Sequence, residues 1–288
     1  NNAAVGFHAL RNNTIGQQNS AFGTYTLREN TSGGANVAFG NYSLRSNSIG
    51  NNNTAVGYQS LFYNITGSNN SAFGMYTMKN NTSGIRNVAF GYGSSFSNLV
   101  GANNTAVGYL ALYTNIATDN TAVGYRSLYA NTSGFNNSAF GLYALRNNTI
   151  GTHNAAFGRS ALQSNLTGVN NSAFGNYALL NNNGGSRNSA FGREALYSNS
   201  TDNNSAFGYK SLYANTIGTS NTAVGTHALA TNTTGSFNSA FGLNALRYNT
   251  IGTNNTAVGY QALLNNSTGS NNSSFGFQTL RYNTIGTS

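Results

Sequence analysis

Apolar and polar positions recur along this chain with a period of 17 residues. Each unit opens with Asn, a small or β-branched residue, Ala, then Val or Phe, and Gly, as in residues 53–57. The alternation predicts a short β-strand that places Thr54 and Val56 on one face. A second element carries the next apolar positions, as at Ser60 and Leu61, and fits either a second strand or one helical turn.

The glycine that ends the first segment sets the register of seventeen units. Consecutive copies lie 17 residues apart, except for two intervals of 16 residues. They are Gly6, Gly23, Gly40, Gly57, Gly74, Gly91, Gly108, Gly124, Gly141, Gly158, Gly175, Gly192, Gly208, Gly225, Gly242, Gly259 and Gly276. Every unit also has an Asn four positions before this glycine and another seven positions after it. The Ala two positions before it is replaced once, by Ser274, and the Leu four positions after it twice, by Met78 and Ser95.

A unit of this length cannot bury its own apolar face, so the units must stack. The predicted fold is all-β: a β-solenoid (parallel β-roll or β-helix) of seventeen coils, one continuous array over residues 1–288 without separate domains. Strands about 4.8 Å apart would give a rod of roughly 80 Å. We expect the Leu and Val/Phe columns to form the core and the two Asn columns to form amide ladders. The uniform Ala column would form a flat outward strip, packed against another chain or a ligand.

Three corners are expected in each coil. The first glycine can adopt φ > 0 at the first corner, and the second Asn column suits left-handed geometry at the next. A later glycine serves the third corner. The two short units lose that glycine and carry Asp119 and Asp202, each of which we expect to form an Asx-turn with its own backbone. Neither end of the array has a distinct cap, so we expect the rod to continue, stack or oligomerise.

The composition removes several classes of protein. Charged residues are 6 % of the chain, against roughly 25 % in typical domains, but the 39 % of hydrophobic residues keep a strict register that a disordered chain does not need. There is no cysteine for disulfides or thiolate metal sites. No apolar run approaches the ~20 residues of a membrane helix, so no membrane insertion is expected. The net charge of +9 favours acidic partners such as anionic polysaccharide.

The stretches at residues 36–40 and 87–91, both Asn-Val-Ala-Phe-Gly, carry a resemblance. They resemble the YadA-like head repeats of trimeric autotransporter adhesins. The full unit is similar to repeats of phage tail-fibre proteins. The resemblance implies a parallel β-roll, usually a homotrimer, that acts in adhesion or host contact. It also implies an extracellular location, on a cell surface or a virion fibre.

Groups that could perform catalysis are few and scattered. The acids and histidines are Glu29, Asp119, Glu194, Asp202, His8, His153 and His227. Glu29 and Glu194 lie about ten coils apart and cannot act as an acid–base pair. No Ser-His-Asp set, metal cluster or phosphate loop can be assembled from the sequence. We therefore expect no enzymatic activity, no metal and no cofactor.

Two surface columns are candidates for binding. The first follows the Leu column and holds the cations Arg11, Arg28, Arg45, Lys79, Arg146, Arg247 and Arg281. It also holds the aromatic residues Phe62, Phe96, Tyr113, Tyr129, Tyr197 and Tyr213. The second lies one or two residues after the first glycine and holds Tyr25, Tyr42, Tyr58, Tyr76, Tyr92, Tyr109, Tyr125, Tyr143, Tyr177, Tyr209 and Tyr260. Tyrosine packs on sugar rings and Arg attracts acidic groups, so a glycan is the expected ligand. The columns could instead be ladders that stabilise the solenoid or a chain–chain interface.

The sequence favours a structural or adhesive fibre segment that assembles with copies of itself and contacts a surface glycan or another acidic surface. Nucleic acid is not expected, because the cations are sparse. The alternative is a monomeric solenoid that binds glycan or ice. An ice-binding face would need regular Thr arrays, whereas the residue after the first Asn is Thr in only five units. These are Thr54, Thr105, Thr121, Thr222 and Thr256.

Overall fold

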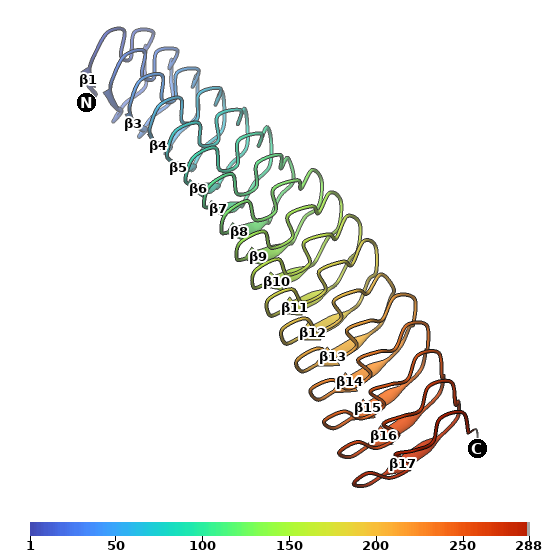
Figure 1. Cartoon of the computed structure of the whole chain (residues 1–288). Helices are drawn as coiled ribbons and strands as arrows, with labels where there is room; N and C mark the ends of the chain where they lie inside the picture. Colours follow the sequence, from blue (N-terminus) through green and yellow to red (C-terminus); the bar gives the residue numbers. More distant parts are fainter. Residues whose placement is uncertain (287–288) are drawn as a thin grey trace. The chain divides into compact units, whose positions relative to one another are not determined.

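The computed structural model describes residues 1–286, and this part of the chain is all-β, built from short strands and turns. Its contacts group into two units, residues 1–142 and residues 143–288, which we describe separately. In each unit the chain winds into a parallel β-solenoid with one strand in every coil (Figure 1). The predicted fold class is thereby confirmed.

Each strand has three residues and coincides with the start of a repeat. Within the described residues, the first unit contains β1 (Ala3–Val5), β2 (Ser20–Phe22), β3 (Val37–Phe39), β4 (Thr54–Val56), β5 (Ser71–Phe73), β6 (Val88–Phe90), β7 (Thr105–Val107), β8 (Thr121–Val123) and β9 (Ser138–Phe140). The second contains β10 (Ala155–Phe157), β11 (Ser172–Phe174), β12 (Ser189–Phe191), β13 (Ser205–Phe207), β14 (Thr222–Val224), β15 (Ser239–Phe241), β16 (Thr256–Val258) and β17 (Ser273–Phe275).

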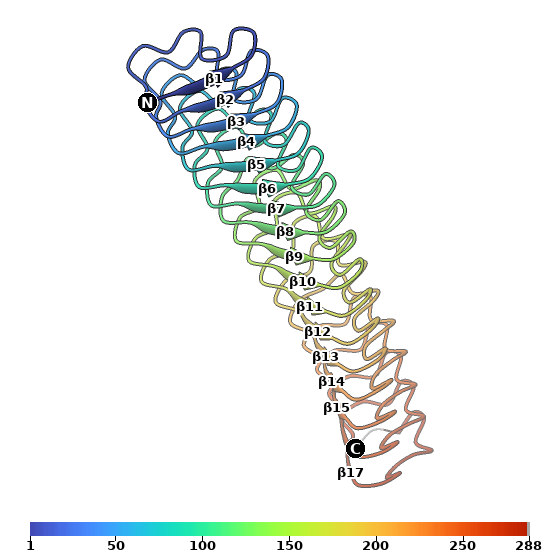
Figure 2. The same cartoon turned by 90° about the vertical axis from the view of Figure 1, so that its left-hand side faces the viewer.

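Equivalent strands of successive coils pair in parallel and without a shift in register. In the first unit, Ala38 of β3 lies opposite Ala21 of β2 and Ala55 of β4. In the second, Ala190 of β12 lies opposite Ala173 of β11 and Ala206 of β13. Figure 2 shows the strands of each unit side by side in sequence order. Equal register places each side chain directly beside its equivalent in the next coil, which produces the expected ladders.

The strand faces are the reverse of the prediction. The middle Ala is fully buried in every strand from β2 to β16, and Ser274 takes its buried place in β17, whereas Ala4 of the terminal β1 is exposed. The Val/Phe column lies at the surface, with Phe39 55 % and Phe241 40 % exposed. The predicted outward Ala strip and the predicted Val/Phe core are therefore both wrong. Because successive strand residues alternate in direction, only one face of each strand can enter the coil. The coil interior already contains leucine and asparagine side chains, which leaves room for a methyl group but not for a phenyl ring.

The second element is neither a strand nor a helical turn but a run of turns. The residue two positions after the first glycine has positive φ, as Tyr25 does at 57°, and so does the residue at the Leu position of every coil, as Leu27 does at 48°. Left-handed geometry is uncommon for leucine. Leu27 is nevertheless fully buried, and its N–H donates to Ser43 O of the next coil at 3.1 Å. Core burial and the inter-coil hydrogen bond stabilise this conformation.

Both asparagine columns form the expected buried amide ladders. Asn36 Nδ2 donates to Asn19 Oδ1 at 3.1 Å, and Asn47 Nδ2 donates to Asn30 Oδ1 at 2.8 Å. The second column does not adopt the left-handed geometry that was predicted for it, and the positive φ lies instead at the Leu column three positions earlier. The amides instead satisfy buried polar groups, as closely packed interiors require.

The later glycine serves the third corner through close approach of the backbone. A Cβ on Gly50 would overlap the carbonyl oxygen of Gly67 and Asn47 Oδ1. The first glycine of each coil has the predicted positive φ, between 121° and 140°. A Cβ on Gly40 would in turn lie 2.9 Å from the carbonyl oxygen of Gly57. The spacing between coils therefore restricts both glycine columns, and positive φ adds a second restriction on the first column.

The aspartates of the two short coils do not form the predicted Asx-turns. Asp119 accepts from Asn103 Nδ2 at 2.9 Å, and Asp202 accepts from the backbone N–H of Ser186 at 2.8 Å, in each case across to the preceding coil. The backbone N–H two residues after Asp119 belongs to Thr121 and donates to Asn137 O instead. Because inter-coil hydrogen bonds occupy the local donors, the carboxylates bind a neighbouring coil.

Within residues 1–286 there is no helix long and apolar enough to span a membrane.

Candidate binding face

The two predicted binding columns lie on either side of the buried Leu. The chain leaves the strand at the first glycine, passes through the tyrosine column and enters the core at Leu. It returns to the surface one residue later, at the cationic column. Arg28 lies over the ring of Tyr25 at 5.4 Å, and Arg146 lies over the ring of Tyr143 at 4.9 Å. The two columns therefore form one surface, which we call the tyrosine–cation face.

In the first unit, seven of the predicted tyrosines form an unbroken ladder, each in ring contact with its neighbour in the next coil. They are Tyr25, Tyr42, Tyr58, Tyr76, Tyr92, Tyr109 and Tyr125. The centroid separations run from 5.2 Å to 6.1 Å. Such ring contacts stabilise the solenoid, and the same tyrosines also carry hydroxyl groups.

Ring orientation within the ladder decides which tyrosines can pack against a ligand. Tyr92, Tyr109 and Tyr125 are stacked nearly parallel, so the face of the central Tyr109 ring is covered on both sides by its neighbours. Tyr58 and Tyr76 meet at 72°, edge to face. We infer that the parallel segment offers a ligand its ring edges and hydroxyls, and that the edge-to-face segment retains free ring surface.

Aromatic rings accompany most of the predicted cations. Arg45 lies over Phe62 at 5.3 Å, and Lys79 lies within 6.0 Å of the rings of Phe62, Tyr76 and Phe96. Arg247 and Arg281 lie over the tyrosines that follow them in sequence, at 5.2 Å and 5.3 Å. Arg11 is exposed. Cations held on aromatic rings keep their charge at the surface while their apolar stems pack against the coil.

The tyrosine–cation face also contains charged residues that were not predicted to lie there. Arg126, Arg159, Arg193, Lys210 and Glu194 occupy positions in the tyrosine column, one or two residues after the glycine. Each of the four cations lies within 6.0 Å of a tyrosine ring. Their position in the repeat was the signal that could have identified them, because any side chain in that column reaches the same surface.

Burial also affects ionisation on this face. Burial raises the pKa of the Tyr113 hydroxyl, with further contributions from Tyr129 and Tyr92. The hydroxyl therefore stays protonated at neutral pH and can donate a hydrogen bond. Burial lowers the pKa of His8, aided by the charges of Arg11 and Arg28, and lowers the pKa of His227 in the same way, aided by Arg247 and Lys210.

A second continuous surface, which we call the strand face, consists of the two outer residues of every strand. These columns hold only Ala, Ser, Thr, Val and Phe, with no charged residue among them. Its phenyl rings stack along each unit, with centroids 4.7 Å apart between Phe73 and Phe90 and 4.8 Å apart between Phe174 and Phe191. This surface is not among the predicted binding columns, because the repeat pattern predicted the Val/Phe column to lie in the core.

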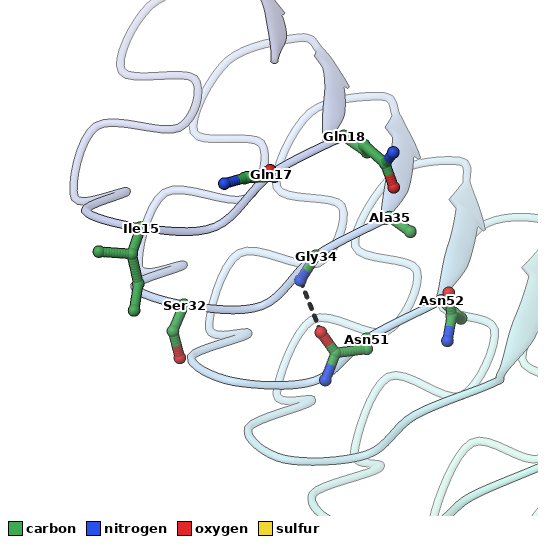
Figure 3. A pocket seen from close by; sticks show the side chains of 8 residues that line it. All are labelled: Ile15, Gln17, Gln18, Ser32, Gly34, Ala35, Asn51 and Asn52. Carbon is green, nitrogen blue, oxygen red and sulfur yellow. Dashed lines mark hydrogen bonds between the residues drawn. The ribbon is translucent and has the colours of Figure 1, made fainter. Parts of the chain in front are cut away.

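A shallow hollow of about 510 Å³ lies over the first three coils (Figure 3). It is flanked by the side chains of Gln17 and Gln18 on one side and of Asn51 and Asn52 on the other. The coil between them contributes Ser32, Gly34 and Ala35, and the N–H of Gly34 donates to Asn51 Oδ1 at 2.7 Å. The hollow is uncharged and open, so it offers polar contacts without a buried anchoring group.

The acids do not gather into a reactive centre. Glu29 lies beside Arg28 at 3.4 Å, Asp202 beside Arg187 at 2.9 Å, and Glu194 between Arg193 and Lys210. Within the part of the chain that the structure describes, no three His, Asp or Glu side chains are placed to hold a metal ion.

No known protein family, curated protein or solved structure matches this chain.

Proposed function

We propose that this protein is a structural segment of an extracellular adhesive fibre and has no enzymatic activity. Copies associate through the strand face and present the tyrosine–cation face to an acidic glycan surface. The observation that carries the proposal is the strand face, a regular, uncharged surface with stacked, exposed aromatic rings in both units. The resemblance of the repeat to those of adhesin heads and tail fibres supports the same function.

The strand face has the chemistry of a protein–protein contact. Contiguous exposed apolar surface is uncommon on soluble monomers and marks interaction sites. In the second unit Phe191, Phe207 and Phe241 are 37–40 % exposed. At about 200 Å² for each phenylalanine, the Val/Phe column of that unit offers roughly 500 Å², and the neighbouring Ser/Thr column adds to it. A standard interface buries about 800 Å² on each partner, so this face alone approaches what a stable pair requires.

The tyrosine–cation face fits contact with an acidic polymer. The protein carries a net charge of +9, and most of the cations lie on or beside aromatic rings of this face. The regular spacing of coils repeats the same contacts along each unit. Weak contacts repeated in this way provide avidity towards a polymer that no single coil would provide.

Molar mass in dilute solution, measured by light scattering after size exclusion, tests the proposed assembly. We expect an oligomer, with a trimer as the form that the repeat resemblance implies. The double variant Phe191→Lys/Phe207→Lys places two charges on the strand face and is expected to shift the protein to monomer. The matched control Ile217→Lys/Ile251→Lys replaces side chains that are 61 % and 51 % exposed elsewhere on the same unit and should leave the molar mass unchanged.

A wild-type protein that remains monomeric at all concentrations, or a control pair that dissociates as readily as the strand-face pair, would contradict the proposed assembly. Binding to an immobilised polyuronate, measured at increasing salt, tests the second surface. We expect affinity that falls steeply with salt, because the contact depends on charge. Equal binding to an uncharged polysaccharide would contradict an acidic ligand.

A further inference from the structure

The second unit contains a hollow of about 170 Å³ in its tyrosine–cation face, lined by Tyr177, Glu194, Tyr197 and Tyr213. We propose that this hollow is a subsite for a carboxylated pyranose, such as one hexuronate residue of an acidic polysaccharide. The proposal rests on the proposed glycan contact and assigns it a place and a ligand chemistry.

The hollow exists because the aromatic column is interrupted. Tyr177 stands two residues after the glycine of its coil, and Glu194 occupies the same position in the next coil. A carboxylate there leaves unfilled the space that another ring would take. Beyond it, Tyr197 and Tyr213 of the cationic column stack at 5.0 Å and close the other side. The site therefore combines three tyrosines and one acid from three successive coils.

Glu194 supplies a hydrogen-bond acceptor in a sheltered position. Its side chain is only 12 % exposed, and its two carboxylate oxygens contact Arg193 Nε at 2.9 Å and Lys210 Nζ at 3.4 Å. A carboxylate oxygen accepts more than one hydrogen bond, so each retains capacity for a ligand hydroxyl. Sugar hydroxyls are suitable donors, and hydrogen bonds to a charged acceptor are stronger than neutral ones.

Cations surround the acid and outnumber it. Arg159 lies over Tyr177 at 5.5 Å, and Lys210 lies over Tyr213 at 5.1 Å and over Tyr209 at 5.4 Å. The hydrogen bonds that the Lys210 ammonium donates to Tyr209 and Glu194 raise the pKa of Lys210 and so favour its charged form. With Arg193, the cluster carries three positive charges and one negative charge. A neutral sugar would leave the excess positive charge unpaired, whereas the carboxylate of an acidic sugar would pair with it.

Stabilisation of the coil does not account for this cluster. Arg193 and Lys210 are 63 % and 32 % exposed, and exposed ion pairs contribute little to stability. The chain has only 4 acids in 288 residues, and most coils have none. An acid in the aromatic column also replaces a ring that would otherwise contact the aromatic rings of neighbouring coils. The arrangement instead matches the division of labour in sugar recognition, in which polar groups orient a ring that aromatic residues enclose.

The test compares glucuronate with glucuronamide, its neutral analogue of nearly the same shape, on the full chain. Binding is measured by ligand-observed NMR and by tyrosine fluorescence. We expect wild type to prefer glucuronate by about tenfold, in line with one charge-assisted contact. Lys210→Gln should abolish most of that preference and leave glucuronamide binding nearly unchanged. Glu194→Gln should weaken the binding of glucuronamide by about threefold to tenfold, because it removes the charged acceptor of the sugar hydroxyls.

Matched controls come from the first unit. Arg86→Gln removes an exposed cation that lies outside the tyrosine–cation face, and Glu29→Gln removes an acid outside the hollow. Both should bind the two ligands as wild type does, with unchanged circular dichroism. Equal affinity of wild type for the two ligands, or equal losses in Arg86→Gln and Lys210→Gln, would overturn the proposal. If polyuronate binds the protein but the Lys210 and Glu194 variants bind the monosaccharides as wild type does, the subsite is wrong and the proposed surface contact stands. If wild type does not bind polyuronate, both the subsite and the proposed surface contact are refuted.

Discussion

The side-chain amides of Asn36 and Asn47 donate to the same backbone carbonyl, that of Gly50, at 2.8 Å and 3.0 Å. Each amide also donates to its equivalent in the preceding coil. Two ladders that begin eleven positions apart in sequence therefore converge inside every regular coil. This convergence explains why asparagine is present at both positions in all seventeen units.

Replacement of a ladder asparagine should be costly. Asn47→Ala removes the Asn47 donor from Asn30 Oδ1 and one of the two acceptors of Asn64 Nδ2, which keeps Gly67 O, and both groups are buried. We expect a loss of about 2–4 kcal/mol in the free energy of unfolding, measured by urea titration. Asn52→Ala is the control, because that side chain is exposed and the preceding coil has Ala35 in the same position. A similar loss in both variants would show that the ladder has no special role.

The adjacent glycines Gly184 and Gly185 should respond differently to the same substitution. A methyl group on Gly185 would overlap Asn182 Oδ1 and the carbonyl oxygen of Thr201, whereas on Gly184 it would meet only Thr167 Oγ1, at 3.2 Å. Gly185→Ala should destabilise the protein by about 1–3 kcal/mol, as overpacking does, and Gly184→Ala by much less. Thermal unfolding followed by circular dichroism distinguishes them. Equal midpoints would contradict the close approach of the coils.

The burial of the strand alanines predicts an asymmetry between neighbouring strand positions. Ala72→Val inserts two methyl groups into a filled interior and should cost about 1–3 kcal/mol. Ser71→Val acts on the outer column, where Val37 and Val88 occur naturally, and should be nearly neutral. Urea titration of both variants measures the difference. If Ala72→Val were more stable than Ser71→Val, the alanine column would face outward, as the sequence predicted.

The first short coil leaves a buried acceptor unpaired, and insertion of one residue should repair it. Asn98 Oδ1 is buried without a hydrogen-bond partner, and Asn115 Nδ2, which stands where a regular coil has the ladder donor, donates to Ala117 O at 2.9 Å. A glycine inserted between Ala117 and Thr118 restores the regular repeat and gives Asn115 the geometry to reach Asn98. We expect a gain of about 1 kcal/mol in the free energy of unfolding. A loss of stability would show that the short coil is the preferred arrangement at this point.

His227 should make the protein less stable in mildly acidic solution. Burial, aided by Arg247 and Lys210, lowers the pKa of His227 below its ordinary 6.5. The unfolded chain therefore binds a proton more readily than the folded one, and this contribution to stability is lost as pH falls below about 6.5. His227→Gln, with the residue found at Gln261, should lose less stability than wild type between pH 7.5 and pH 5. Identical pH dependence in a thermal melt would assign the effect to other groups.

The sequence by itself determined the period, the strand positions, the parallel pairing, the asparagine ladders and the positive φ of Gly23 and its equivalents. Each follows from the repeat, because a unit that cannot bury its own apolar side chains must place equivalent residues beside one another. The same reasoning located the tyrosine and cation columns. It predicted two separate surfaces where the fold makes one, because the left-handed residues Tyr25 and Leu27 return both columns to the same side of the coil.

Only the tertiary structure decided which strand face enters the coil. Alternation places Ala38 and Phe39 on opposite faces of the strand, but it does not determine which face enters the coil. Hydrophobicity alone favours burying the larger side chain. The space left by Leu44 and by the amides of Asn36 and Asn47 admits a methyl group and excludes a phenyl ring. The volume of a coil depends on how its corners close, and that closure depends on left-handed leucines and shared carbonyls that no local propensity indicates.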